Sequence, residues 1–335
     1  MKEWFRLVGI RRPEFMGWSQ TELDKKVYHK GWSPVIDTEF SMTEFPSLQQ
    51  TQGKHYGSGH ALSEMDRYIA DYAAIVKKAE EISKTIRPEL QDAYYAVVLY
   101  PVKAASANAV QRLEAQKSRR TGDETAGQKA LAAHQEIIDL TKYYNEKMAG
   151  GKWRYSMNSH PRELLAFQIP ELTDTLPKTD LKSVKADTSE YVAQNAYKYI
   201  NVDGTVKTVE MLGHSMKTLS ITKGSSVTYS FNVKSAGDAT LYTAMIPTQS
   251  NDTGDIRYSV SIDGGQPVII SLKEKFRSKK WKLNVLRGQA LNKTPITLTK
   301  GTHTLTIKAL DNHILADQWM VDFAKDRHFY VIPAK

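Results

Sequence analysis

Five side chains near residue 150 have the types and spacing to bind a sugar. They are aromatic, amide and basic residues around an expected helix end: Tyr144, Asn145, Lys152, Trp153 and Arg162. An indole face stacks on the C–H groups of a pyranose, and a basic group pairs with a uronate carboxylate. The same residues also suit a structural role, in which Tyr144 and Trp153 close the end of a helical bundle and Arg162 caps a helix. The sequence leaves both interpretations open.

A similar combination lies within residues 273–287, where Trp281 and Arg287 belong to a basic cluster opposed only by Glu274. The cluster contains Lys273, Lys275, Arg277, Lys279, Lys280, Lys282 and Arg287. Such a surface can bind acidic polysaccharide or phosphate. Alternatively, it is a solvated loop or strand edge, where lysines discourage edge-to-edge pairing, and Trp281 is a sandwich-edge residue. No nucleic-acid-binding motif accompanies the charge, so no nucleic-acid partner is expected.

The residues needed for catalysis or metal binding do not form a recognisable pattern. Glycoside hydrolysis usually requires two carboxylates held across the scissile bond. Acidic residues are available near the start of the chain, and we expect them to be surface or inter-domain acids: Glu14, Glu22, Asp37, Glu39 and Glu44. Asp311, His313 and Asp317 lack zinc or EF-hand spacing and predict a hairpin with polar tips. We therefore expect no catalytic residue, no metal and no cofactor in this chain.

Composition narrows the class of protein. The chain has 335 residues, no cysteine and a formal charge of +9, and almost all of that excess lies after residue 175. The lack of cysteine excludes disulfides, thiolate metal sites and cysteine nucleophiles. The content of 41% hydrophobic and 25% charged residues is ordinary for a globular protein. The longest apolar run, residues 93–100, is shorter than the about 20 residues that span a bilayer, and the N-terminus has no signal-peptide pattern, so no membrane partner is expected.

The first half has helical periodicity. A capping box at Ser63 and Asp66 opens a helix that ends at Arg87-Pro88. A second helical run covers about 89–118, and Pro101 must kink or divide it. A third covers about 124–149 and is closed by Gly150-Gly151. Three long helices with short connections predict an up-and-down bundle.

The second half has a period of two. Apolar and polar residues alternate over 227–233 and 256–262, with glycine turns at 263–265 and 300–301. Further strand-like runs cover 241–246, 268–272, 302–310 and 318–323. This pattern predicts an antiparallel β-sandwich.

Together these patterns predict an α+β protein with two segregated domains. We expect an irregular junction segment over 1–60, a helical bundle over 61–172, a linker over 173–186 and a β-sandwich over 187–335.

Several segments are more specific than these periodicities, and in this order they resemble the part of glycoside hydrolase family 115 that follows its catalytic barrel. They are residues 11–18 (RRPEFMGW), 94–102 (YYAVVLYPV), 143–145 (YYN), 151–153 (GKW), 160–162 (HPR), 241–248 (LYTAMIPT), 257–263 (RYSVSID), 281–287 (WKLNVLR) and 301–305 (GTHTL). The chain departs from the family pattern at Gly288, where Asn is usual, and at Asp311-Asn312-His313, where Asp-Pro-Gly is usual. Both are local turn changes that leave the expected fold in place.

The resemblance implies a function for a longer enzyme. Family members are multi-domain α-glucuronidases that remove (4-O-methyl)glucuronic acid from xylan, with the active site in a TIM barrel. A barrel needs about 250 residues, and only some 60 precede the first expected helix. This chain is therefore expected to be the bundle-and-sandwich part of such an enzyme, as a truncated chain, a split-gene product or a barrel-less paralogue. It is expected to be non-catalytic, to support the barrel through residues such as Glu14 and Trp18, to form a homodimer, and to be periplasmic or extracellular. The alternative is a carbohydrate-binding module for acidic plant polysaccharide, such as acidic xylan, that uses the basic cluster.

Overall fold

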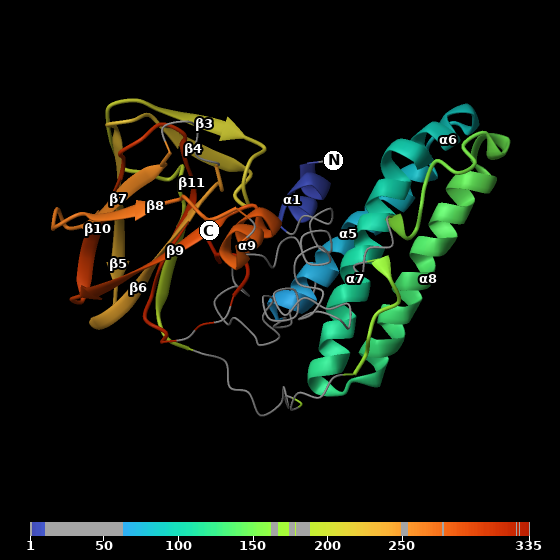
Figure 1. Ribbon diagram of the computed structural model, residues 1–335, viewed down its shortest axis with the longest axis horizontal. Coiled ribbons are helices and arrows are strands. Elements are labelled where there is room, and N and C mark those ends of the chain that lie inside the picture. Colours follow the sequence, from blue (N-terminus) through green and yellow to red (C-terminus); the bar gives the residue numbers. More distant parts are fainter. Residues whose placement is uncertain are drawn as a thin grey trace. The chain divides into compact units, whose positions relative to one another are not determined.

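The computed structural model describes residues 2–10, 63–161, 167–173, 178, 188–248, 254–276, 278–325, 327 and 329–334, with the side chains of Lys279 and Lys282 left out. By its internal contacts the chain divides into a unit of residues 1–8 and 13–186 and a unit of residues 9–12 and 187–335. The first is helical and the second is built of antiparallel sheets, so the predicted α+β class is confirmed (Figure 1). None of the described helices is long and apolar enough to cross a membrane.

The described residues of the helical unit form four helices of nine or more residues. These are α1 (Lys2–Ile10), α5 (Glu64–Ser83), α7 (Tyr100–Thr121) and α8 (Glu124–Glu146). Shorter helical turns join or follow them, namely a 3-10 turn (Pro88–Leu90), α6 (Gln91–Tyr94), a π-helical turn (Tyr95–Leu99) and a 3-10 turn (Met148–Gly151). The expectation that the start of the chain is irregular is wrong for α1, because Leu7 and Ile10 form a buried apolar stripe. The rest of residues 1–60 lies outside the described residues.

The helix boundaries follow from local chemistry. Ser63 accepts a hydrogen bond from the amide of Asp66 at 3.0 Å, which is the predicted N-cap of α5. Asp123 caps α8 in the same way, and Gly122 ends α7 with a φ of 77°. The predicted break at Pro101 is confirmed: proline has no amide hydrogen, and the chain passes through the π-helical turn just before it.

Two buried arginines of α7 bind the segment of residues 168–172, which runs back along the helix. Arg112 donates to the carbonyl of Gln168 at 3.0 Å, and Arg119 donates to that of Glu171 at 2.6 Å. Leu172 then packs on Ala115 and Ala130, where small side chains let α7 and α8 approach closely. Residues 168–172 therefore form part of the helical unit.

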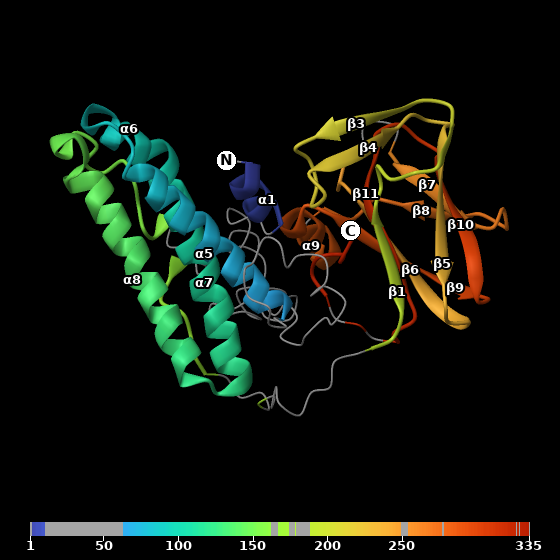
Figure 2. The ribbon, with the colours of Figure 1, turned by 180° about the vertical axis from the view of Figure 1, so that it is seen from behind.

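The second unit is a sandwich of two antiparallel sheets. Its strands are β1 (Tyr191–Asn195), β2 (Asn201–Asp203), β3 (Val206–Glu210), β4 (Lys217–Ile221), β5 (Ser226–Val233), β6 (Gly237–Met245), β7 (Arg257–Ile262), β8 (Val268–Ser271), β9 (Ala290–Leu298), β10 (Gly301–Ala309) and β11 (Ile314–Asp322). One sheet has the order β3-β4-β11-β6-β9, and β1 pairs with β11. Figure 2 gives the view of these strands from behind. The other has the order β2-β5-β10-β7-β8.

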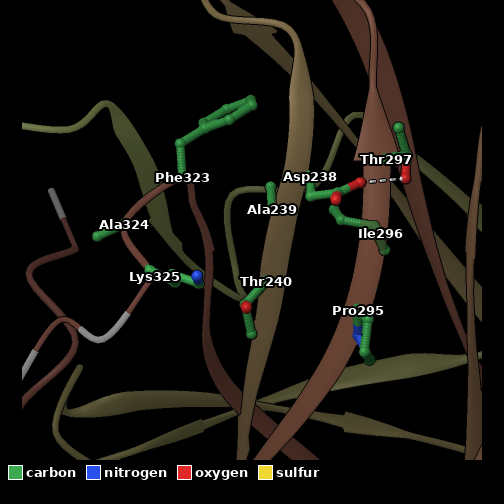
Figure 3. A pocket seen from close by; sticks show the side chains of 9 residues that line it. All are labelled: Asp238, Ala239, Thr240, Pro295, Ile296, Thr297, Phe323, Ala324 and Lys325. Atoms are coloured by element: carbon green, nitrogen blue, oxygen red, sulfur yellow. Dashed lines mark hydrogen bonds between the residues drawn. The ribbon is translucent and has the colours of Figure 1, made fainter.

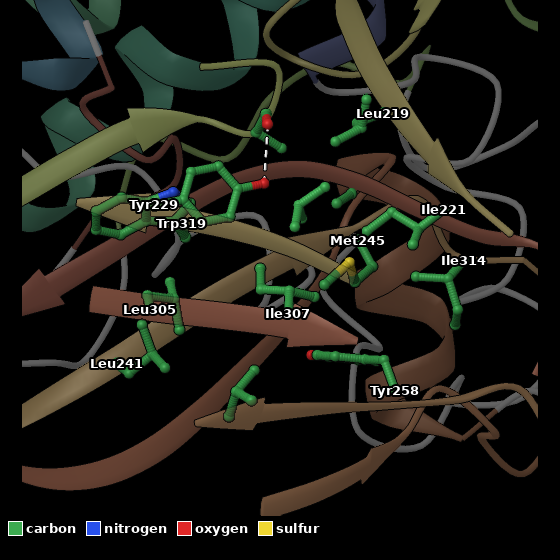
Figure 4. Packing of buried hydrophobic residues seen from close by; sticks show 14 of the residues in the cluster. Leu219, Ile221, Tyr229, Leu241, Met245, Tyr258, Leu305, Ile307, Ile314 and Trp319 are labelled. Atoms are coloured by element: carbon green, nitrogen blue, oxygen red, sulfur yellow. Dashed lines mark hydrogen bonds between the residues drawn. The ribbon is translucent and has the colours of Figure 1, made fainter. Parts of the chain in front are cut away.

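The core lies between the two sheets (Figure 4). Trp319 of β11 is fully buried and packs 5.5 Å from the rings of Tyr229 and Phe231 on β5. The hydroxyl of Tyr229 donates to the carbonyl of Ala196 at 2.8 Å, so this buried polar atom is satisfied. The alternation read in residues 227–233 is thus the alternation between core and outer face.

Two local expectations for the sandwich are wrong. The segment Lys279–Arg287, expected as a loop or strand edge, is the helix α9. Ser278 caps its start by accepting from the amide of Trp281 at 3.1 Å, and Gly288 ends it with a φ of 70°. Asp317, expected at a polar hairpin tip together with Asp311, instead lies within β11 and is fully buried.

Candidate functional site

Aromatic rings cover the end of the bundle where α6, the π-helical turn and the C-terminus of α8 meet. The ring of Tyr95 lies 4.6 Å from that of Tyr143, and the ring of Tyr100 lies 4.9 Å from that of Tyr144. Tyr95 donates to the carbonyl of Leu140 at 3.1 Å. Burial raises the pKa of both Tyr95 and Tyr100, so these phenols stay neutral and pack rather than transfer protons.

Of the sugar-binding candidates, Tyr144 and Asn145 belong to this packed end. Tyr144 is half-buried beside Tyr100. The amide of Asn145 donates to the carbonyl of Met157 at 2.8 Å and accepts from the Met157 amide at 3.0 Å. Asn145 therefore fastens the segment after α8 to the helix.

Lys152 and Trp153 lie in that fastened segment. The ammonium of Lys152 is 5.2 Å from the centre of the Trp153 ring, within cation–π range. Trp153 is 43% exposed, and the neighbouring Tyr155 is 88% exposed. The indole is thus presented outward and does not plug the bundle. Arg162, Glu14 and Trp18 lie outside the described residues.

The second group of candidates, Trp281 and Arg287 of the basic cluster, lies on α9. Trp281 is half-buried and packs edge-on against Phe276 at 5.1 Å, and Phe276 is exposed. Lys280 pairs with Glu274 at 2.5 Å. Arg287 is buried and lies over the ring of Tyr330 at 4.7 Å, which is a packing contact. The structure therefore places the side chains of Trp281 and Arg287 in different surroundings.

Asp317 is a buried carboxylate within β11, where the sequence predicted a residue at a polar hairpin tip. The register of β11 against β6 shifts between Ala316 and Gln318, so Asp317 sits at a bulge that redirects its side chain. Its carboxylate accepts hydrogen bonds from the amides of His214 at 2.7 Å and Ser215 at 3.2 Å, and from the Ser215 hydroxyl. Gln289 donates to it as well, at 2.5 Å. A carboxylate bonded in this way anchors the β3–β4 loop and is not available for catalysis.

The pKa of the Asp71 carboxyl group is moved to neutrality. Burial raises the pKa of Asp71 to about 7, although Arg6 at 2.8 Å acts in the opposite direction. Its position between α1 and α5 indicates a structural contact, because the neighbouring Tyr68 also donates to the carbonyl of Leu7 there. The described residues contain no group of three or more His, Asp or Glu side chains that could hold a metal ion.

A cavity of about 660 Å³ lies on the sandwich, at one end of β6 and β9 (Figure 3). It is lined by Asp238, Ala239 and Thr240 of β6, by Pro295, Ile296 and Thr297 of β9, and by Phe323, Ala324 and Lys325 after β11. Apolar side chains and charged or hydroxyl groups therefore face one space. Sequence reasoning did not identify this set, because its three segments are far apart in the chain.

The chain matches one protein-family model and is similar to a solved structure of the same family. Residues 183–335 match the model of the glycosyl hydrolase family 115 C-terminal domain. The whole chain is similar to the solved structure of BtGH115A, described as a family GH115 4-O-methyl-α-glucuronidase with specificity for decorated arabinogalactans. The identity is 29% and the TM-score 0.73, over 94% of this chain and 37% of that one. This chain thus spans little more than a third of that protein's length.

Two further matches have much lower scores. The C-terminal CBM6 of LamC from Zobellia galactanivorans has 13% identity and a TM-score of 0.32, over 40% of this chain and 99% of that one. An exo-β-1,3-galactanase from Phanerochaete chrysosporium has 14% identity and the same TM-score, over 43% and 32%. Such scores indicate nothing about a ligand. No curated protein matches the chain.

Proposed function

We propose that this chain is a non-catalytic unit that supports and dimerises a family 115 α-glucuronidase, since residues 183–335 match the model of that family's C-terminal domain and 94% of the chain is similar to BtGH115A. The observation that carries the proposal is the match, at a TM-score of 0.73, of 94% of the chain to 37% of a known family member. With 94% of the chain covered, the match includes both the helical unit and the sandwich.

The chemistry of the described carboxylates supports the non-catalytic part of the proposal. A glycosidase needs two carboxyl groups that face each other across space for a sugar. The buried acids Asp317 and Asp322 are instead bonded to protein groups, the latter to Arg327 at 2.9 Å. Asp71 has a raised pKa but is only 8% exposed and lies against Arg6.

Exposed apolar side chains at the end of the bundle support the dimerisation part. Trp153, Tyr155 and Tyr143 are well exposed there, and Val97 of the π-helical turn is 67% exposed. Aromatic residues are enriched where proteins associate, because they bury large surfaces at low entropic cost. A second copy of the chain placed on this end would remove these side chains from water.

An activity assay tests the non-catalytic role. The purified chain is incubated with glucuronoxylan and, because of the relative's specificity, with decorated arabinogalactan, and released glucuronic acid or its 4-O-methyl form is measured. A full-length family 115 enzyme serves as the positive control. We expect no release above the heat-treated chain; a steady release by this chain alone would contradict the proposal.

The alternative function, binding of acidic polysaccharide, has its own observation. Lys273 and Lys275 are exposed on the sandwich next to the exposed ring of Phe276. Affinity electrophoresis in glucuronoxylan should then show retardation that falls with added salt, because salt screens exposed charges. The double variant K273A/K275A should lose it, and the matched variant K223A/K308A should keep it. Equal retardation in neutral xylan would exclude this function.

A further inference from the structure

The cavity on the sandwich has a defined polar side and a defined apolar side. In the β6–β9 pair Asp238 lies opposite Thr297, and Thr240 lies opposite Pro295. Opposite residues of an antiparallel pair point to the same face, so these four share the outer face of the sheet. Phe323 and Lys325 approach this face from the segment after β11 (Figure 3).

The polar groups of the cavity are held in place but keep hydrogen-bonding capacity for a ligand. Oδ1 of Asp238 accepts a hydrogen bond from the hydroxyl of Thr297 at 2.9 Å, which fixes the carboxylate. Within the described part of the chain, Oδ2 of Asp238 has no further partner, and the ammonium of Lys325 forms no ion pair. One acceptor and one donor, both charged, are therefore available to a ligand in the same space.

The wall that carries Phe323 and Lys325 is held rigidly. The amide of Phe323 donates to the carbonyl of Glu190 at 3.0 Å, and the amide of Ala324 donates to Asp322 at 2.9 Å. Asp322 is itself fully buried and paired with Arg327. A preformed wall means that a ligand would not have to order this segment on binding.

The lining selects a class of ligand. The volume lies within the about 300–1,000 Å³ of small-molecule sites. Half-buried Phe323 and exposed Pro295 offer apolar surface, while a carboxylate, an ammonium and two threonine hydroxyls surround it. A lipid would leave these polar groups unpaired, and a metal ion would find one carboxylate only. A sugar ring has both an apolar C–H face and a rim of hydroxyls, and it satisfies both sides.

We propose that the β6–β9 cavity binds a single pyranose residue of a glycan. Oδ2 of Asp238 accepts hydrogen bonds from adjacent hydroxyls, Lys325 donates to a ring or hydroxyl oxygen, and the C–H face rests on Phe323 and Pro295. This site shares no residue with the basic cluster of 273–287 or with the end of the bundle. The proposed sugar site can therefore be confirmed or refuted independently of the proposed support and dimerisation role.

Titration of the full chain with methyl glycosides tests the proposal. Methyl xyloside, galactoside, glucoside and glucuronide are added separately and followed by saturation-transfer NMR and calorimetry. We expect at least one to bind, and D238A and K325M each to raise its dissociation constant about 10-fold or more, because charged hydrogen bonds are removed. The glycoside that binds best identifies the sugar.

Matched variants separate this site from general effects. D203A and K308M remove exposed charges from the other sheet and should leave the dissociation constant unchanged, as should K273A/K275A on the basic cluster. Both Asp238 and Lys325 are exposed, so their replacement leaves the core intact. Failure of every glycoside to bind at its highest soluble concentration, or unchanged binding by D238A, would overturn the proposal.

Discussion

The carboxylate of Asp317 lies against Gly213, in the space that a side chain at position 213 would occupy. Gly213 also has a φ of 76°, which L side chains rarely adopt. The β3–β4 loop thus wraps the buried acid closely enough for two successive backbone amides to bind it. This contact ties the loop to the bulge of β11.

Replacing Gly213 by alanine should destabilise the sandwich by about 3 kcal/mol or more, because the new methyl group displaces Asp317 and the backbone is strained. Gly224 is a matched control: its φ is 84° and nothing lies within 4 Å of the position of a Cβ. G224A should cost only the strain, about 1–2 kcal/mol. Chemical denaturation followed by tryptophan fluorescence measures the free energy of unfolding of both variants. An equal decrease for G213A and G224A would show that Asp317 does not restrict position 213.

Replacing Asp317 itself by asparagine should also destabilise the sandwich. The amide keeps one acceptor oxygen but turns an NH2 group toward donors, so buried hydrogen bonds to a charge are lost. We expect a decrease of about 3 kcal/mol in the free energy of unfolding. D203N, on the exposed face of β2, should change it by less than about 0.5 kcal/mol. A D317N variant as stable as D203N would refute the anchoring role.

The burial of Asp71 predicts a pH dependence for the stability of the helical unit. Burial raises the pKa of Asp71 from 3.8 to about 7. Between these values the folded chain holds a proton that the unfolded chain has lost. The contribution of Asp71 to stability is therefore full below about pH 4 and is lost as the pH rises through 7.

Thermal unfolding at a series of pH values measures this effect. From pH 5 to 7 the wild-type free energy of unfolding should fall relative to that of D71N, by at most about 1.4 kcal/mol per pH unit. The lowered pKa of His134 gives a slope of the opposite sign, but it is common to both proteins and cancels in the comparison. Parallel curves for the two proteins would contradict the raised pKa.

The sequence predicted those features that depend on local patterns. Ser63 as a cap, Pro101 as a break and the alternation along β5 each act within a few residues, and each is found in the structure. The short strands β1 to β4 were not predicted, since β3 alternates weakly and β2 has three residues. β2 forms by pairing with β5 and β3 by pairing with β4, while β1 and β4 both pair with β11.

The candidate site was less predictable, because its residues are brought together by contacts between distant segments. A bulge shifts the period of a strand by one residue, so alternation could not show that Asp317 is buried. Lysines of α9 concealed a helix whose inner face carries Leu286 and Asn284. The cavity of Asp238 and Lys325 requires the pairing of β6 with β9, which only the folded chain reveals.

The molar mass of the chain in solution tests the central proposal most directly. Light scattering coupled to size exclusion should give twice the 37.8 kDa of one chain. W153A/Y155A should shift the protein to the monomer mass, and F276A, which removes an exposed aromatic ring from the sandwich, should leave the dimer intact. A dimer that survives W153A/Y155A would exclude the end of the bundle as the contact. A wild-type chain that stays at 37.8 kDa at every concentration would contradict a dimerising unit altogether.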